Sequence, residues 1–309
     1  MVIYEPNKNW LKDVVHLHRS WTLQKIVRAV MLMGMFTGIF CFVVLHFGLL
    51  EHVGANTGVY SLLGVALSIV LVYRTNTAYE RWWEGRKQWG ALVNTCRDLA
   101  ITVHATFPKE DEESRKFFAK HMANFCIALR DHLRTGVNVD DLILMQPEER
   151  DHYKAKNHIP NHIVSVMFGR IQEAFKKGDI TPEDILNLKP PITHLLDIMG
   201  ACERIRKTPI PFSYAVYIKL FIMLYGAFLP FGLVEDFGYF TIPIVMIVFF
   251  AFIGLEMMAA EIEDPFGLDC NDLPTGDIAH NIKNNVFEIL EARKPVAEEP
   301  SKELYQKVF

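Results

Sequence analysis

The chain has 309 residues, half of them hydrophobic and 12% aromatic, which is more apolar than most soluble globular domains. Its formal net charge of −4 is small for this length, whereas a nucleic-acid binder normally shows a strong basic surplus. We therefore expect no nucleic-acid partner. The composition points instead to a chain that resides in a lipid bilayer.

Five cysteines are widely spaced, and the sequence contains no C-x-x-C pair and no Cys/His cluster with zinc spacing. We interpret them as reduced, mostly buried thiols: Cys41, Cys96, Cys126, Cys202 and Cys270.

Two apolar stretches follow a basic N-terminal segment of residues 1–28. Residues 29–50 contain no charged side chain in 22 positions, and residues 53–73 contain none in 21. Because about 20 apolar residues in a helix cross a bilayer core, each stretch is predicted to cross once, with a tight turn over residues 51–56 between them. The first stretch is too long for the apolar part of a signal peptide, so residues 29–73 are expected to remain as a membrane-anchoring hairpin.

A second apolar block covers residues 209–260. It is interrupted by PFGLVEDFGYFTIP at residues 230–243, which supplies turn residues and charge. The block is predicted to form a third span near residues 212–231 and a fourth near residues 239–258. The expected fold is an all-α membrane protein with four transmembrane helices; the alternative is a set of buried helices in a large soluble core.

The distribution of basic residues predicts the orientation. Residues 47–60 and 230–243 contain neither Lys nor Arg, while residues 1–28 and the centre of the chain are rich in both. Since Lys and Arg accumulate on the cytoplasmic side of a membrane, both termini and the central region are predicted to be cytoplasmic. We expect a multi-pass protein of the cell membrane, the inner membrane if the source is bacterial.

The central region, residues 74–208, is too polar to cross a membrane and shows helical punctuation. Acidic residues near position 112 precede a periodic apolar stretch that ends near Gly136, and residues 161–177 repeat the pattern before Gly178. Thr181 and Pro182 are typical of a helix start. No stretch alternates long enough to predict a strand. Residues 261–291 are predicted to be an acidic segment and a helix, and residues 292–309 a flexible tail.

Val65, Ile69 and Tyr73 are spaced by four residues in the second span and therefore lie along one helical face. Such a face around a symmetry axis would form a hydrophobic gate that closes by dewetting. Packing against a neighbouring helix is the alternative, and the spacing alone favours it.

Four segments resemble the bestrophin family, in the family's order. They are SLLG (residues 61–64), YRTNTAYERWWEGRKQWG (73–90), CERIRKTPIPFSYAVYIK (202–219) and EIEDPFGLDCNDLP (261–274). The resemblance implies a ring-shaped homopentameric channel in which the second helix lines a central pore. It also implies that Val65, Ile69 and Tyr73 form the neck of that pore, which reverses the preference from spacing alone.

The resemblance further implies a cytoplasmic constriction near Ile180 and Glu183. Five copies of Glu183 around an axis would concentrate cations, so we slightly favour a channel for monovalent cations over a chloride channel. An ordinary acid in the first turn of a helix is the alternative role for this residue.

In animal bestrophins an acidic segment after the fourth span binds Ca²⁺. By similarity, Asp269 and Asp272 occupy the carboxylate positions, and Glu261 and Asp264 lie near the carbonyl ligands. Such hard oxygen ligands suit Ca²⁺, the only cofactor that the resemblance suggests. The alternative is that the acids simply form the polar end of a membrane helix.

We find no pattern typical of an enzyme. G-x-S-x-G, the Walker loop and H-E-x-x-H are all missing from the sequence. His121 and His132 have no partner at metal-ligand spacing and are interpreted as ordinary surface or core residues. Besides a channel, the sequence is compatible with a non-conducting membrane scaffold or regulator, and less with a carrier, because paired interrupted helices are missing.

Overall fold

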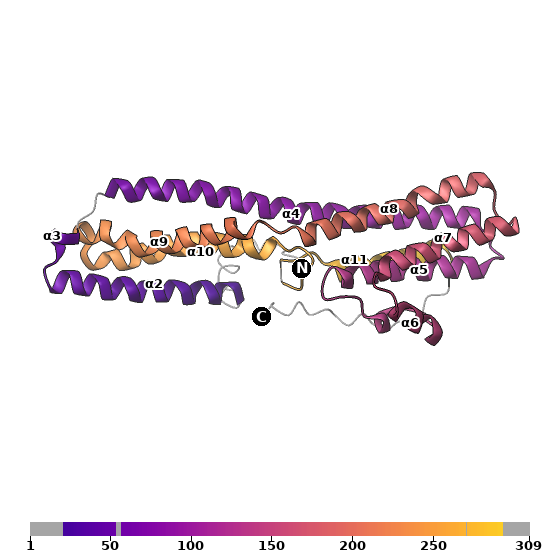
Figure 1. Ribbon diagram of the computed structural model, residues 1–309, viewed down its shortest axis with the longest axis horizontal. Helices are drawn as coiled ribbons and strands as arrows, with labels where there is room; N and C mark the ends of the chain where they lie inside the picture. Colours follow the sequence, from indigo (N-terminus) through magenta and orange to yellow (C-terminus); the bar gives the residue numbers. More distant parts are fainter. Residues whose placement is uncertain (1–20, 54–56, 270, 293–309) are drawn as a thin grey trace, which may run out of the picture.

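The computed structural model describes residues 21–53, 57–269 and 271–292, and within these ranges it contains helices and no strand. The molecule is a long rod of helices (Figure 1). In chain order the elements are α2 (Trp21–His46), α3 (Leu50–Val53), α4 (Thr57–Thr106), α5 (Glu112–His132), η1 (Val139–Asp141), α6 (Pro147–Lys154), α7 (Ile159–Lys177), α8 (Pro182–Lys207), α9 (Phe212–Phe237), η2 (Gly238–Phe240), α10 (Thr241–Ile262) and α11 (Thr275–Ile289).

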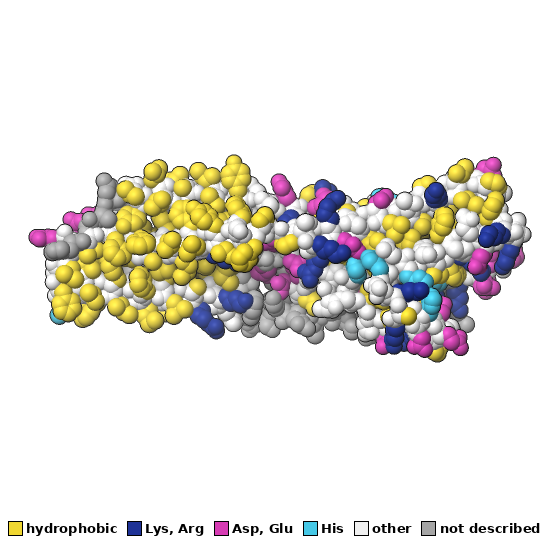
Figure 2. All heavy atoms as spheres, viewed as in Figure 1, with side chains coloured by type: hydrophobic (Ala, Val, Ile, Leu, Met, Phe, Trp, Pro, Cys, Tyr) yellow, Lys and Arg dark blue, Asp and Glu magenta, His cyan; other side chains and the backbone are white. Residues whose placement is uncertain are grey.

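One end of the rod, which we name the apolar half, consists of α2, α3, α9, α10 and the first part of α4. Hydrophobic side chains cover its visible surface, whereas charged side chains gather on the other half (Figure 2). In the described part of the chain, three helical stretches are long and apolar enough to cross a membrane: Thr22–His46, Thr57–Thr106 and Phe212–Ile262. The last contains α9 and α10, which pack side by side with η2 between them (Figure 1).

Helix α4 is continuous over 50 residues and belongs to both halves. The expected division between residues 73 and 74 therefore falls inside a helix, because the polar segment that follows Tyr73 contains no proline and continues the helical hydrogen bonding.

The other end, the polar half, packs α5, α8 and α11 against the last part of α4, and α7 packs against α5 and α8. Its core is one large hydrophobic cluster around fully buried Trp89, Phe118 and Leu195. The predicted helix after residue 161 is confirmed as α7 and ends at Gly178, whose φ of 81° is the left-handed conformation that glycine favours. Thr181 caps α8 as predicted, because its Oγ1 accepts from the N–H of Asp184 at 3.2 Å.

The thiols of Cys41, Cys96, Cys126 and Cys202 are free and buried, which confirms the interpretation of these four. Cys270, the N-terminal segment through residue 20, residues 54–56 of the predicted tight turn and the tail after residue 292 lie outside the described residues.

Candidate functional site

The three residues of the expected neck lie on an exposed face of α4. The side chains of Val65, Ile69 and Tyr73 are 59%, 53% and 67% exposed, while Leu67 and Leu71 are fully buried against α9 and α10. Eight residues of helix correspond to a rise of about 12 Å, so the three side chains form a continuous apolar strip along the helix. Within the described part of one chain, no packing partner buries this strip.

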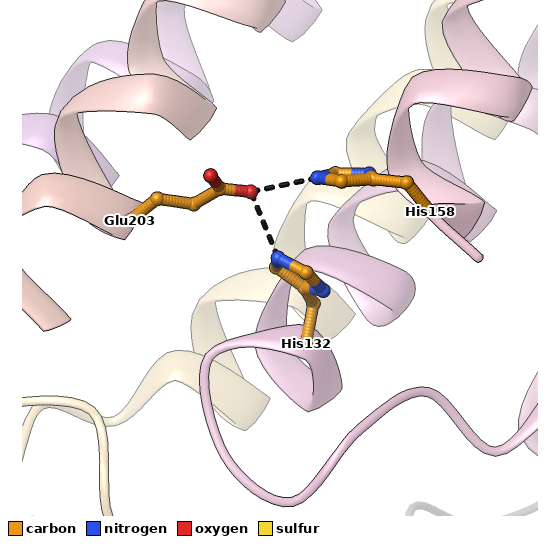
Figure 3. Close-up of side chains that lie close together, drawn as sticks. All are labelled: His132, His158 and Glu203. Carbon is orange, nitrogen blue, oxygen red and sulfur yellow. Dashed lines mark hydrogen bonds and ion pairs between the residues drawn. The ribbon is translucent and has the colours of Figure 1, made fainter. Parts of the chain in front are cut away.

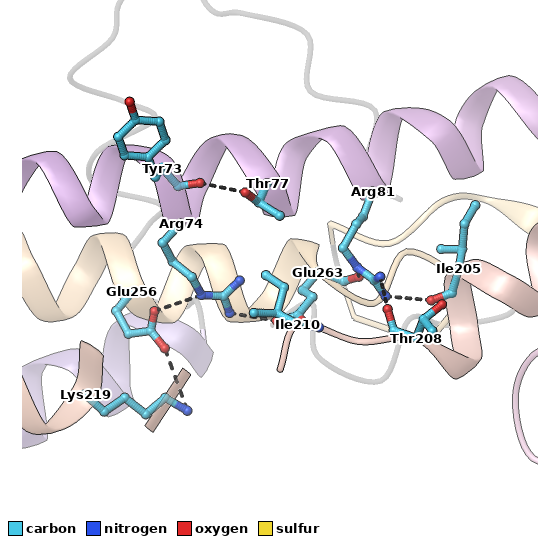
Figure 4. A network of polar contacts seen from close by, with 10 residues as sticks. All are labelled: Tyr73, Arg74, Thr77, Arg81, Ile205, Thr208, Ile210, Lys219, Glu256 and Glu263. Carbon is cyan, nitrogen blue, oxygen red and sulfur yellow. Dashed lines mark hydrogen bonds and ion pairs between the residues drawn. The ribbon is translucent and has the colours of Figure 1, made fainter. Parts of the chain in front are cut away.

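Directly after Tyr73, the helix turns a charged side chain inward. Arg74 is 1% exposed; its Nη2 donates to Glu263 Oε2 at 2.7 Å, and its Nε lies 3.4 Å from Glu256 Oε2. Glu256 in turn lies 3.7 Å from Lys219 Nζ, and Glu263 Oε1 accepts from the N–H of Ile210 at 2.8 Å. Figure 4 shows Tyr73 pointing away from this network.

The Arg74 network was not apparent from the sequence. A signal was present, because Glu256 is the first charged residue of α10 and an acid inside an apolar helix indicates a functional or paired position. Its partner could not be identified from spacing, because Arg74 and Glu256 are far apart in the chain.

Arg81, two turns further along α4, caps the C-terminal end of α8. Its Nη1 and Nη2 donate to the carbonyl oxygens of Thr208 and Ile205 at 2.5 and 2.6 Å, and its Nε donates to the carbonyl of Glu263 at 3.1 Å (Figure 4). Cations favour helix C-termini, where carbonyl groups lack intrahelical partners. Arg81 therefore joins α4, the end of α8 and the end of α10 at the junction of the two halves.

The acidic segment after α10 is folded tightly onto α4. The carboxylate of Asp272 is buried; its Oδ2 accepts from the backbone N–H of Asp269 at 2.6 Å, while its Oδ1 is buried without a hydrogen-bond partner in the described part of the chain. Burial, together with the nearby acids, raises the pKa of Asp272 to about 7.

Glu261 and Asp264 of the expected calcium segment have protein partners for their side chains. Asp264 pairs with Arg206, and Glu261 accepts from Thr22 Oγ1 at 2.6 Å and from Asn271 Nδ2 at 3.1 Å.

At the far end of the polar half, the two residues of the expected constriction have opposite environments. Glu183 is exposed in the first turn of α8, whereas Ile180 is only 5% exposed and packs in the core of the polar half. One turn after Glu183, Leu186 is 70% exposed. The outward-facing pair at this end is therefore Glu183 and Leu186, because the apolar side chain of Ile180 is already used in the core.

Comparisons with known proteins cover both halves of the chain. The model of the family described as Bacterial/Fungal Bestrophin protein matches residues 2–288. A voltage-dependent anion channel-forming protein of Synechocystis sp. is 34% identical over 233 residues, which are 74% of this chain and 75% of the relative. The voltage-dependent anion channel-forming protein YneE of Escherichia coli is 31% identical over 291 residues, which are 93% of this chain and 94% of the relative.

Among solved structures, a bacterial bestrophin homologue from Klebsiella pneumoniae superposes with a TM-score of 0.81 at 25% sequence identity. The match covers 87% of this chain and all of the Klebsiella chain. The likeness therefore extends over the apolar half, the junction and the polar half.

Proposed function

Because the chain belongs to the bacterial and fungal bestrophin family, we propose that it is an ion channel that conducts small monovalent ions through a cell membrane. The observation that carries this proposal is the exposed apolar strip of Val65, Ile69 and Tyr73 on a helix long enough to cross a bilayer. The names of the curated relatives, which describe channel-forming proteins, support the same class of function.

The proposed subunit crosses the membrane four times. Helices α2, α9 and α10 have 26, 26 and 22 residues, which corresponds to about 33 to 39 Å at 1.5 Å per residue and exceeds the bilayer core of about 30 Å. The apolar first part of α4 supplies the fourth crossing. The connections without Lys or Arg then lie outside the cell, and both termini and the polar half lie in the cytoplasm.

The proposed channel is a ring of subunits, because one subunit has no axial path for water, and the resemblance to bestrophins implies that the ring has five. Large apolar side chains exposed on the polar half support contact with other subunits, since a cytoplasmic surface rarely leaves such groups in water. Tyr79, Trp83 and Ile101 are exposed along α4.

In this ring, Val65, Ile69 and Tyr73 face the axis and form the neck. Ions lose part of their hydration there, and the strip can close the pore by dewetting. Glu183 and Leu186 form the second constriction, and the ring of Glu183 carboxylates makes the pore prefer cations. The names of the relatives favour anions instead, so the test of this proposal must distinguish cation from anion selectivity.

Recording from purified protein in planar bilayers with unequal KCl on the two sides tests the proposal. We expect single-channel current steps and a reversal potential shifted from zero toward the equilibrium potential of K⁺. A reversal potential shifted toward the equilibrium potential of Cl⁻ would reject the cation preference but not the proposal that the protein is a channel. No conductance under any gradient, together with a monomer or dimer in detergent, would favour the non-conducting scaffold.

We further propose that the segment of residues 261–272 binds Ca²⁺. The donor set consists of oxygens, as Ca²⁺ requires, and the buried Oδ1 of Asp272 has no protein partner in the described ranges. Asp269 and Asp272 would supply carboxylates, and Glu261 and Asp264 backbone carbonyls. Added Ca²⁺ should raise the melting temperature of the wild type but not of Asp272→Asn, and an equal rise in both would reject the site.

A further inference from the structure

Two histidines and a glutamate from three different helices meet on the surface of the polar half. His132 is the last residue of α5, His158 caps the start of α7, and Glu203 lies in the last two turns of α8. The Nε2 atoms of His132 and His158 donate to the same oxygen, Oε1 of Glu203, at 2.8 and 2.7 Å (Figure 3). Tertiary structure therefore gives His132 the partners that sequence spacing did not indicate.

We propose that His132, His158 and Glu203 bind one divalent transition-metal ion such as Zn²⁺, independently of the ion path. One ligand atom from each residue lies within 4.8 Å of the other two. Two ligands of a tetrahedral zinc ion lie about 3.3 Å apart, given Zn–N bonds of about 2.0 to 2.1 Å. The two Nε2–Oε1 distances of 2.8 and 2.7 Å would therefore open by about half an ångström to admit the ion.

The type of ligand selects the metal. Two imidazoles and one carboxylate suit Zn²⁺ and its neighbours in the first transition row, whereas Mg²⁺ and Ca²⁺ prefer oxygen alone. Glu203 can serve as a ligand without losing its other contact, because Lys207 Nζ pairs with Oε2 at 3.2 Å and leaves Oε1 to the histidines. The side chains are 19% to 30% exposed, so the carboxylate and the rings are partly shielded from water but accessible to an ion.

The neighbouring surface provides room for a fourth ligand. His132 lines a cavity of about 360 Å³ together with Gly136, Val137 and Asn157. Lys154 and Lys156 also line it, and Lys154 pairs with Asp140 at 3.3 Å. A water molecule from this cavity completes a tetrahedral site with three protein ligands.

Metal binding changes one hydrogen bond of α7. In the metal-free protein, His158 Nδ1 accepts from the N–H of Asn161 at 3.3 Å, so the ring carries its proton on Nε2. An ion on Nε2 moves this proton to Nδ1, which then no longer accepts from Asn161. The ion replaces this long cap bond, and the two hydrogen bonds to Glu203 Oε1, by metal–ligand bonds that join the end of α5, the start of α7 and α8.

The test uses the full-length protein without a histidine tag, stripped with EDTA and titrated with Zn²⁺ in a calorimeter. We expect one ion per chain. Glu203→Gln and His132→Gln should each weaken binding by at least about tenfold. The matched control is His152→Gln. His152 and His162 form a second histidine pair of the polar half, with ring centroids 5.0 Å apart. This variant should bind Zn²⁺ as the wild type does.

A second measurement needs no variant. Co²⁺ added to the stripped wild type should develop the intense visible bands of a tetrahedral ion, and Zn²⁺ should remove them by displacement. Three results would overturn the proposal. Co²⁺ could give only the weak bands of an octahedral ion, or Zn²⁺ could release no heat of binding to the wild type. The third is Zn²⁺ binding of wild-type affinity by a Glu203→Gln protein that elutes at the wild-type volume. Conductance is not part of the test, so failure of the channel proposal would not affect it.

Discussion

Arg74 Nε lies 3.4 Å from Glu256 Oε2, and both side chains are 1% exposed. This ion pair joins α4 to α10 one residue after Tyr73, which points to the opposite side of α4 (Figure 4). Because a helix is stiff, fixing Arg74 inward also fixes the outward direction of the strip that precedes it. The pair therefore helps to hold outward the face that the four-residue spacing of Val65, Ile69 and Tyr73 creates.

The first prediction concerns this pair. Arg74→Met leaves Glu256 and Glu263 without their shared cation, and we expect a loss of about 3 kcal/mol or more, because removing one partner of a buried pair strands the other charge. Thermal unfolding in detergent, followed by tryptophan fluorescence, measures the loss. Adding Glu256→Met to Arg74→Met should restore most of it.

The control for the pair is Lys219→Met. The Lys219 side chain is 57% exposed and 3.7 Å from Glu256, so its loss should cost less than about 1 kcal/mol. An Arg74→Met protein as stable as Lys219→Met would contradict the assignment of the buried pair.

The second prediction concerns the neck. A polar side chain in a dry constriction favours its wetting, so Ile69→Ser should increase single-channel conductance or open probability several-fold. The matched control is Ile39→Ser on α2. Ile39 is 62% exposed, compared with 53% for Ile69, and we place it against lipid. Equal effects of both substitutions in planar-bilayer recordings would remove Ile69 from the neck.

The third prediction concerns selectivity. Glu183→Gln removes one negative charge per subunit without changing the size of the side chain, so the reversal potential in a KCl gradient should move toward that of Cl⁻. Glu148→Gln is the control, because Glu148 is exposed on α6, on the other side of the rod from α8 (Figure 1). An unchanged reversal potential in Glu183→Gln would show that this carboxylate does not face the ions.

The fourth prediction concerns the contact between α4 and the acidic segment. A Cβ atom on Gly85 would lie 3.1 Å from Pro265 Cγ and 3.2 Å from two ring carbons of Phe266, and both neighbours are rigid. Gly85→Ala should therefore destabilise the protein by about 1 to 3 kcal/mol through overpacking.

Gly169→Ala is the matched control for Gly85, because Gly169 lies inside α7 and a Cβ atom added there would meet no described atom within 4 Å. This substitution should stabilise the protein by about 0.5 to 1 kcal/mol, since alanine is the better helix former. If the melting temperature rose in both variants, Pro265 and Phe266 would have shifted to accommodate the added Cβ atom, and overpacking would be rejected.

The fifth prediction concerns pH. Burial lowers the pKa of His121 from 6.5 to about 4, and its Nδ1–H donates to the carbonyl of Phe117 at 2.7 Å. Between these two pH values the unfolded chain binds a proton that the folded chain does not, so stability falls as the pH falls from about 6.5 to about 4. The full contribution is about 3 kcal/mol.

The variant His121→Asn keeps a donor for Phe117 but does not titrate. Its free energy of unfolding should therefore fall less than that of the wild type over the same pH range, as measured by denaturant titration at several pH values. Parallel pH profiles for the two proteins would show that folding does not lower the pKa of His121.

The sequence alone determined the chemistry of local segments. Hydrocarbon tolerates only uncharged helical stretches, so the apolar runs before Tyr73 and after Pro209 were visible without coordinates, and the motifs around Trp82 and Phe266 indicated the family. The caps at Gly178 and Thr181 were also predictable, because a helix end depends on a few neighbouring residues.

Tertiary structure decided every pairing between distant residues. Arg74 with Glu256, Gly85 with Phe266, and His132 with His158 and Glu203 come together only when long helices pack with a particular rotation and offset. Tertiary structure also decided that Ile180 packs in the core while Glu183 faces outward, although the two are three residues apart. The physical reason is that apolar patterning determines which stretches become helices, while the packing of bulky and charged side chains between helices determines which residues meet.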